Sequence, residues 1–320
     1  MMQKKAALPA VILGGDPFNR FRYLYRQSLW WKLHDPLYAL QVMRAAYEAG
    51  CRAFELSEDS NVQLFWRLRV EVDEPILGFG NPTWEQGVML NGRFLMLSRD
   101  RILRTLMDRP MLPNGVVTTI REQLSKSAVL VFGYDRTAVP LTEEEIADIY
   151  LDEDIFLKRL SGFGGACQYI LLGGTDADYL LSLGRVNILH RMVELVRRSG
   201  FEPLLLCHYG SYVVPIAEEA GLQVSGYAIP LNREWGWFDR DECVRIVHAI
   251  DKPFVAFMPL ANGQLGRDVR GALEWLFSVA KVDSVLFGTA LPDHAAETTR
   301  VALELACNYV TKQDTKHAAN

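Results

Sequence analysis

The sequence has 320 residues, of which 49% are hydrophobic and 23% charged, and its formal net charge is -5. This composition is typical of a globular protein with a large core, and α/β barrels of this length commonly form one domain. The charge balance disfavours a nucleic-acid partner. No apolar run reaches the roughly 20 residues that a membrane span needs, so we expect no membrane partner.

The five cysteines are scattered and none forms a close pair. This pattern predicts reduced, mostly buried thiols in a cytoplasmic protein and argues against a cysteine zinc site. The basic residues at the start of the chain run directly into an apolar strand. They lack the long apolar segment of a signal peptide.

Short apolar runs alternate with helical patterns along the whole chain, and nine of these runs are typical of buried strands. In chain order they cover 10–15, 52–57, 75–80, 128–133, 168–174, 203–207, 222–229, 253–258 and 284–289. Helices are predicted over 35–50, 62–72, 101–107, 118–124, 142–160, 186–198, 213–220, 241–250 and 272–276, and from Pro292. Asp35 before Pro36, and Thr142 three residues before Glu145, are typical helix-start signals.

Strand–helix alternation favours an α/β fold, and we expect eight strands to close into a (β/α)8 TIM barrel. The run at 76–80 is taken as the extra strand, within an insertion at about 75–127 between barrel strands two and three. One domain would span 1–312, followed by a frayed tail at 313–320. An open doubly wound sheet also suits the alternation, but no Gly-x-Gly-x-x-Gly turn follows the first strand.

Polar residues at the carboxyl ends of barrel strands are the candidate active-site residues, because that end of a TIM barrel carries the site. The candidates are Asp16, Glu55, Glu58, Asp135, Asp176, His208, Tyr209, Asn232, Arg233 and Glu234. From this set we expect Glu55, Asp135, His208, Tyr209 and Asp16 to be catalytic.

Two kinds of chemistry remain open for Glu55, Asp135 and His208, which come from different strands. Carboxylates beside a neutral imidazole are ligands for zinc or manganese, so a divalent metal is one option. The other is a metal-free acid/base pair of Glu55 or Asp135 with His208 or Tyr209. A structural role is the competing interpretation, with Glu55 in a salt bridge and His208 bonded to a neighbouring loop.

The chain resembles the aldo-keto reductases over most of its length outside 75–127. The resemblance is carried by 35–55, by 157–160 with 168–174, by 256–265, and by 285–297. Family members use an Asp-Tyr-Lys-His tetrad, in which Tyr donates a proton and Lys tunes it. By resemblance, the Asp position falls on Glu55 and the Tyr position meets residues 58–60. The Lys position falls near Gly133 and the His position on Gly173 or Gly174, so the tetrad is expected to be missing.

The resemblance also implies an NADP site at the last helix. His294 stands where the family has a phosphate-binding basic residue, and Glu297 with Thr298 matches the adenine-contacting pair. Gly288 and Thr289, just before this helix, can bind phosphate through backbone N–H groups. The ring-stacking aromatic of the sixth strand falls on Ala228 or Tyr227.

Three functions therefore remain open. The first is an enzyme that acts on a small polar molecule by acid/base or metal-assisted chemistry rather than by standard carbonyl reduction. The second is an NADP-dependent oxidoreductase with a non-standard site. The third is a non-catalytic binding protein, whose barrel mouth is plugged by residues 18–31 or by the 75–127 insertion.

Overall fold

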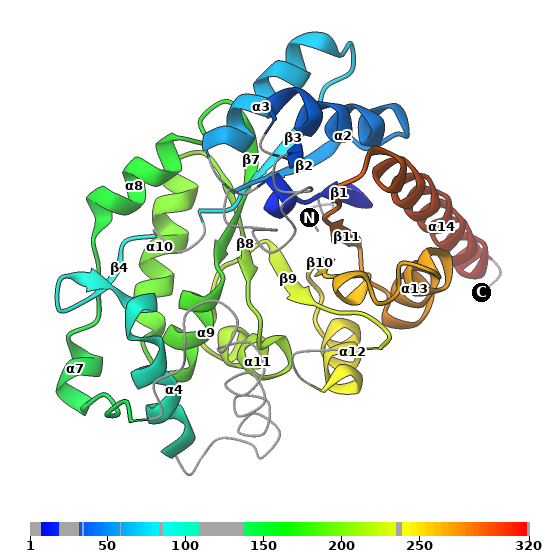
Figure 1. Ribbon diagram of the computed structural model, residues 1–320. Helices are drawn as coiled ribbons and strands as arrows, with labels where there is room; N and C mark the ends of the chain where they lie inside the picture. The colour runs from blue at the N-terminus through cyan, green and yellow to red at the C-terminus, as the bar shows by residue number, and fades with distance from the viewer. Residues whose placement is uncertain are drawn as a thin grey trace.

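The computed structural model describes residues 8–18, 32–33, 35–57, 59–82, 86–108, 137–234 and 239–318. Within these ranges, eight parallel strands form a closed barrel in the order β1-β11-β10-β9-β8-β7-β3-β2, and helices surround it (Figure 1). The strands are β1 (Val11–Leu13), β2 (Ala53–Leu56), β3 (Leu77–Gly80), β7 (Cys167–Gly173), β8 (Glu202–Leu206), β9 (Gly226–Pro230), β10 (Phe254–Phe257) and β11 (Ser284–Phe287). The expected TIM barrel is confirmed.

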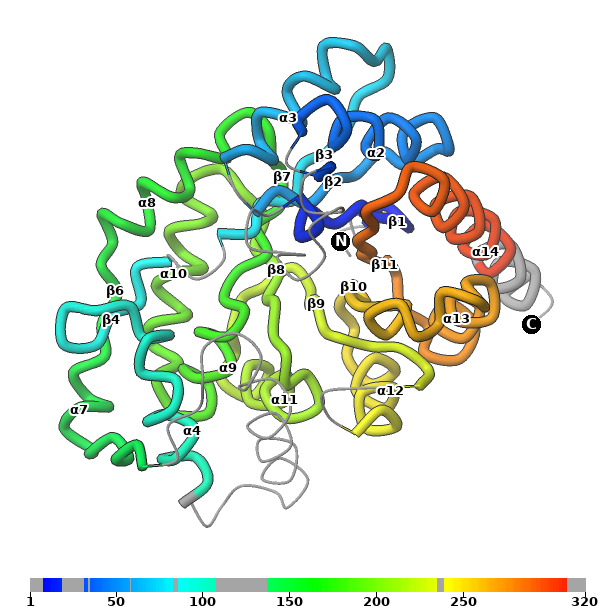
Figure 2. Tube along the Cα trace, in the orientation of Figure 1, coloured from blue at the N-terminus to red at the C-terminus, as the bar shows by residue number. Residues whose placement is uncertain are grey.

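The helices follow the strands around the outside of the barrel, as the chain trace shows (Figure 2). Their bounds are η1 (Asp16–Phe18), α2 (Pro36–Glu48), α3 (Asp59–Glu71), η2 (Leu95–Ser98), α4 (Arg99–Asp108), α7 (Glu143–Ala147), α8 (Glu153–Ser161), α9 (Thr175–Ser182), α10 (Val186–Arg198), α11 (Gly210–Glu219), α12 (Arg240–Ala249), η3 (Ala261–Gly263), α13 (Val269–Trp275), η4 (Leu276–Ala280) and α14 (Pro292–Ala318). Helix α14 thus extends into 313–320, where the sequence suggested a frayed tail.

Alternation along each strand divides the core into two layers, because successive side chains point to opposite faces. The inward layer fills the barrel and is a separate cluster of Ile12, Ala53, Phe79, Tyr169, Leu171, Leu204, Ala228 and Val255. Within it, the rings of Phe79 and Tyr169 stack with their centroids 4.8 Å apart. The barrel interior is therefore a packed core rather than a channel.

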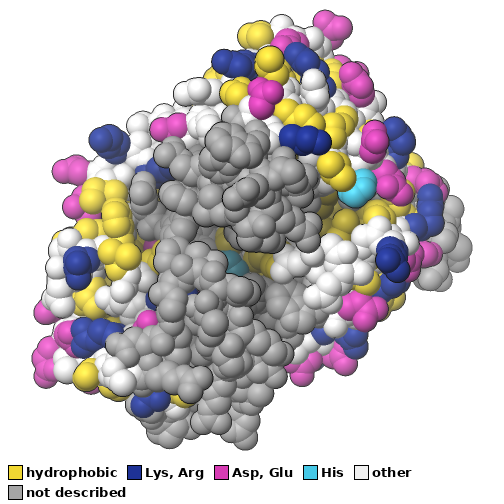
Figure 3. Space-filling view, viewed as in Figure 1, with side chains coloured by type: hydrophobic (Ala, Val, Ile, Leu, Met, Phe, Trp, Pro, Cys, Tyr) yellow, Lys and Arg dark blue, Asp and Glu magenta, His cyan; other side chains and the backbone are white. Residues whose placement is uncertain are grey.

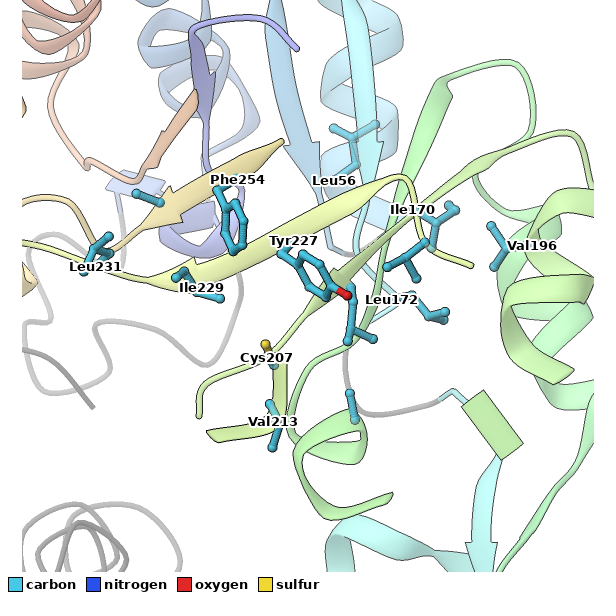
Figure 4. Close-up of a cluster of buried hydrophobic side chains, with 14 of the residues drawn as sticks. Leu56, Ile170, Leu172, Val196, Cys207, Val213, Tyr227, Ile229, Leu231 and Phe254 are labelled. Carbon is cyan, nitrogen blue, oxygen red and sulfur yellow. The ribbon is translucent and has the colours of Figure 1, made fainter. Parts of the chain in front are cut away.

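The outward layer packs the helices against the barrel. In Figure 4, Tyr227 and Phe254 lie side by side on neighbouring strands, close to Cys207 and Ile229. The two rings have centroids 5.4 Å apart, and the Tyr227 hydroxyl donates a hydrogen bond to the Glu218 carboxylate. Burial of this apolar layer supplies the main stabilisation of the fold.

The prediction that 76–80 is the extra strand, outside the barrel, is wrong. Strand β3 pairs in parallel with β2 and with β7, so it is the third barrel strand. The strand contains two glycines because Gly78 and Gly80 lie too close to neighbouring atoms for a side chain to fit. The predicted strand 128–133 lies outside the described residues.

The long excursion from the barrel consequently follows β3 rather than preceding it. Between β3 and β7 it contains a small antiparallel sheet of β4 (Val88–Leu90), β5 (Arg93–Phe94) and β6 (Tyr150–Leu151). The predicted capping box of Thr142 and Glu145 is present at the start of α7. Glu145 also binds Arg101 of α4 at 2.6 Å, which joins α4 to α7.

We predict that Phe79→Ala lowers the free energy of unfolding by about 3–5 kcal/mol, because it leaves a cavity in the packed barrel interior. Urea denaturation measures this change. The control Leu97→Ala, at a side chain that is 71% exposed, should change it by less than about 0.5 kcal/mol. Equal, small effects of both variants would contradict the placement of β3 in the barrel.

Candidate functional site

The carboxyl ends of the parallel strands meet at one rim of the barrel, and the polar candidates gather there. Glu55 belongs to β2, His208 follows β8, and Asp178 lies on α9 just after β7. In the space-filling view, a histidine side chain is visible near the centre of the face between undescribed residues (Figure 3). A rim of this kind is where TIM barrels carry their chemistry.

Two glycines at the end of β7 direct the chain into α9. Gly173 has a φ of 100° and Gly174 a φ of 57°, a region that favours glycine. A Cβ atom on Gly173 would also lie 2.4 Å from the Cβ atom of Ala177. This tight turn brings Asp178, in the first turn of α9, beneath the loop that follows β8.

Asp178 and His208 form the best-defined polar contact at this rim. The Asp178 carboxylate accepts hydrogen bonds from the backbone N–H groups of His208 and Tyr209, each at 3.0 Å. Its Oδ2 atom also lies 3.0 Å from His208 Nδ1. The Asp178 side chain is 1% exposed, whereas that of His208 is 28% exposed.

This contact determines what the imidazole can do. A carboxylate only accepts hydrogen bonds, so His208 Nδ1 carries the proton and Nε2 is the basic nitrogen. The ring edge also packs against Phe257 of β10, with centroids 5.7 Å apart. The ring is thus held by a carboxylate and by an aromatic neighbour. A carboxylate-oriented imidazole is the arrangement of a general base.

Asp178 was missed in the sequence analysis, although its neighbour Asp176 was among the strand-end candidates. The available signal was Asp-Ala-Asp at 176–178, directly after the glycine pair that ends an apolar strand. No helix was predicted over 175–182, where the structure has α9.

Asp176 is a second buried carboxyl group in the first turn of α9. It is 3% exposed, and its Oδ1 atom has no hydrogen-bond partner among the described residues. Burial, and after it the nearby charge of Asp178, raises the pKa of the Asp176 carboxyl well above its usual value of 3.8. This environment therefore disfavours the ionised form of Asp176.

We predict that Asp176→Asn stabilises the protein relative to wild type by an amount that grows with pH. The folded wild type retains a proton that the unfolded chain loses above pH 3.8, so wild-type stability falls as pH rises past that value. The asparagine variant has no such ionisation. Free energies of unfolding measured from about pH 4 to about pH 8 test this. A difference that stays constant over the range would contradict it.

Glu55 is buried, and its carboxylate accepts hydrogen bonds from the ends of two neighbouring strands. The salt bridge expected for Glu55 stays a prediction. Its Oε2 atom accepts from the Gly15 backbone N–H at 2.5 Å, and its Oε1 atom accepts from the Asn81 amide at 2.8 Å. Asn61 of α3 in turn donates to the Gly15 carbonyl at 3.0 Å. Glu55 thus joins β1, β2 and the end of β3 at the rim, so a structural role accounts for these contacts.

The other expected catalytic residues lie in different settings. Asp16 is exposed in η1, next to the end of β1. Tyr209 is buried in the outward core layer, and burial raises the pKa of its phenol well above the usual value. Asp135 and Glu58 lie outside the described residues. The convergence of Glu55, Asp135 and His208 stays a prediction, with Glu55 and His208 on the same rim.

The strand-end candidates after β9 contact their own loop and residues that follow β10. The Asn232 amide donates to the Met258 carbonyl at 3.2 Å, and its side-chain oxygen accepts from the Glu234 backbone at 3.2 Å. Arg233 binds the Asp268 carboxylate at 2.7 Å. These contacts fix the loops after β9 and β10 to each other.

The four residues expected to bind cofactor lie together around the start of α14. Gly288 and Thr289 follow β11, and the Thr289 hydroxyl accepts a hydrogen bond from the Leu291 backbone at 3.3 Å. His294 and Glu297 are exposed on the first turns of the helix. Their assignment as cofactor-binding residues stays a prediction.

The nicotinamide end of NADP is not matched in the same way. Tyr227 and Ala228 on β9, the sixth barrel strand, are both fully buried. Tyr227 packs against Phe254 in the outward layer, and Ala228 lies in the barrel interior. Neither residue offers a ring face to a cofactor.

A divalent metal site was the other cofactor expectation. No group of three or more His, Cys, Asp or Glu residues suited to a metal occurs in the described part of the chain. The proposed ligand Asp135 is not among those residues, so the metal set of Glu55, Asp135 and His208 stays a prediction.

Comparisons with known proteins support the fold. No family model and no curated protein matches the sequence. Two solved structures of Pseudomonas aeruginosa proteins assigned to the aldo-keto reductases match with TM-scores of 0.51 and 0.52. They are 14% and 15% identical, and the alignments cover 93% of this chain and 90% and 91% of theirs. The chain therefore has an aldo-keto reductase-like barrel.

This likeness concerns the fold and does not test the family's catalytic positions. The Lys position expected near Gly133 lies outside the described residues. The predicted absence of the complete tetrad stays a prediction.

Proposed function

We propose that this chain is an enzyme that acts on a small polar molecule by general acid–base chemistry at the carboxyl end of the barrel. His208 is the proposed catalytic base, and Asp178 positions it. The observation that carries this proposal is the buried Asp178 carboxylate, which contacts His208 Nδ1 at 3.0 Å and leaves Nε2 as the basic nitrogen.

The proposed reaction begins when His208 Nε2 accepts a proton from a substrate O–H group, or from a C–H group next to a carbonyl. The imidazole then carries a positive charge, which the adjacent Asp178 carboxylate stabilises. Returning that proton to another carbon or oxygen atom of the same molecule completes an isomerisation, and returning it to a departing hydroxyl group completes an elimination of water. Burial and the Asp178 charge raise the pKa of the Asp176 carboxyl, so a second negative charge in this helical turn is disfavoured.

Substitution of His208 tests the proposal. A panel of hydroxy acids, keto acids, sugars and sugar phosphates is screened for conversion by the wild-type protein. On any molecule converted, His208→Gln should lower the rate by about 100- to 10,000-fold, the usual contribution of a general base. The control His190→Gln, at an exposed position on α10, should leave the rate unchanged. Full activity of His208→Gln would refute the assignment.

An NADP-dependent oxidoreductase is the second candidate, because His294 and Glu297 are exposed together at the start of α14. It predicts saturable quenching of tryptophan fluorescence on titration with NADPH, with competition by NADP. His294→Gln should weaken that binding, since the imidazole would face the phosphate. Absence of quenching would leave the acid–base enzyme, or a binding protein if no substrate is converted.

The remaining expectations form part of the same proposal. The described helices include none long and apolar enough to cross a membrane. We infer a small-molecule ligand, no nucleic-acid partner and a cytoplasmic location from the composition. Metal-assisted chemistry would need Asp135 beside Glu55 and His208, whereas the acid–base route rests on contacts of described residues.

A further inference from the structure

The excursion between β3 and β7 is attached to the barrel rim by the side chain of Gln86. This residue is 2% exposed and precedes β4. Its amide nitrogen donates to the Gly173 carbonyl at 2.7 Å, and its amide oxygen accepts from the Gly173 N–H at 2.9 Å. One side chain thus satisfies both backbone groups of Gly173, which lies 87 residues later in the chain.

Gly173 lies where β7, β8 and the start of α9 meet, next to the Asp178–His208 pair. It is the last residue of β7 and pairs with Leu206 of β8, two residues before His208. The next residue, Gly174, donates to the Leu206 carbonyl at 2.8 Å. The Gly174 carbonyl then accepts from the Asp178 N–H at 3.2 Å, which opens α9. A shift of Gly173 therefore moves Asp178 relative to the ring that it holds.

We propose that Gln86 is a positioning residue for the Asp178–His208 pair, and that through it the β3–β7 excursion holds the site in its active geometry. The effect of Gln86 on turnover rests on the proposed function. Its effect on the position of Asp178 and His208 does not, because their contact is part of the structure. An amide is required at this position, since it must donate and accept at once.

Substitutions at Gln86 separate this role from general stability. Gln86→Met keeps the length of the side chain but removes both hydrogen bonds, which leaves the buried backbone groups of Gly173 unpaired. Gln86→Asn keeps the amide but is one methylene shorter, and it serves if the methionine variant does not fold. The matched control is Thr105→Val.

Thr105 is suitable as a control because it anchors the same excursion without touching Gly173. It is 6% exposed, and its hydroxyl accepts from the Leu141 N–H at 2.7 Å and donates to the Arg101 carbonyl at 2.8 Å. Loss of these bonds should destabilise the excursion and leave the Gly173 backbone in place.

The readout is the tautomer of His208, observed by nitrogen NMR of protein labelled with ¹⁵N-histidine and assigned with the His208→Gln variant. Wild type and Thr105→Val should show the Nδ1–H form. In Gln86→Met the His208 signals should shift toward a mixture of the two tautomers, as in Asp178→Asn, and turnover should fall.

Three results distinguish this inference from the proposed function. An unchanged His208 signal in both Gln86 variants overturns the positioning role, whatever their activity. A shifted signal in Thr105→Val also overturns it, because any loosening of the excursion would then suffice. Full turnover by His208→Gln refutes the proposed function and leaves the effect of Gln86 on the tautomer intact.

Discussion

The account depends on a single buried carboxylate. Asp178 accepts hydrogen bonds from two backbone N–H groups in the turn after β8. It also binds the imidazole ring of His208, the first of these two residues. Charge-assisted hydrogen bonds of this kind are stronger than neutral ones, and burial prevents water from competing for them. The same atoms that hold the loop in place therefore also orient the proposed base.

The barrel provides what this carboxylate needs. Parallel pairing of β7 with β8 sets the ends of the two strands side by side, and the Gly173–Gly174 turn directs α9 back over them. A loop alone would not hold a base to the precision that proton transfer needs. At the end of β2, Glu55 makes a comparable set of hydrogen bonds that joins β1, β2 and β3. Rigid strand ends thus support both buried carboxylates.

Much of the fold could be predicted from the sequence, because the apolar runs and capping signals are local. The place of the strand at 77–80 in the barrel could not be predicted, since its glycines reflect close approach of neighbouring strands, which a single sequence does not reveal. His208 and Glu55 were predicted because they follow or occupy clear strands. Asp178 was not, because its importance comes from a turn that places it against a residue 30 positions later. Gln86 was missed for the same reason.

The most direct measurement is neutron diffraction from crystals of the deuterated protein, which locates the hydrogen between Asp178 and His208. We predict density for deuterium on Nδ1, directed at the Asp178 carboxylate, at a pH where the imidazole is neutral. A bare Nδ1 with deuterium on Nε2, or a protonated Asp178, would contradict the central claim that this carboxylate prepares His208 to act as a base.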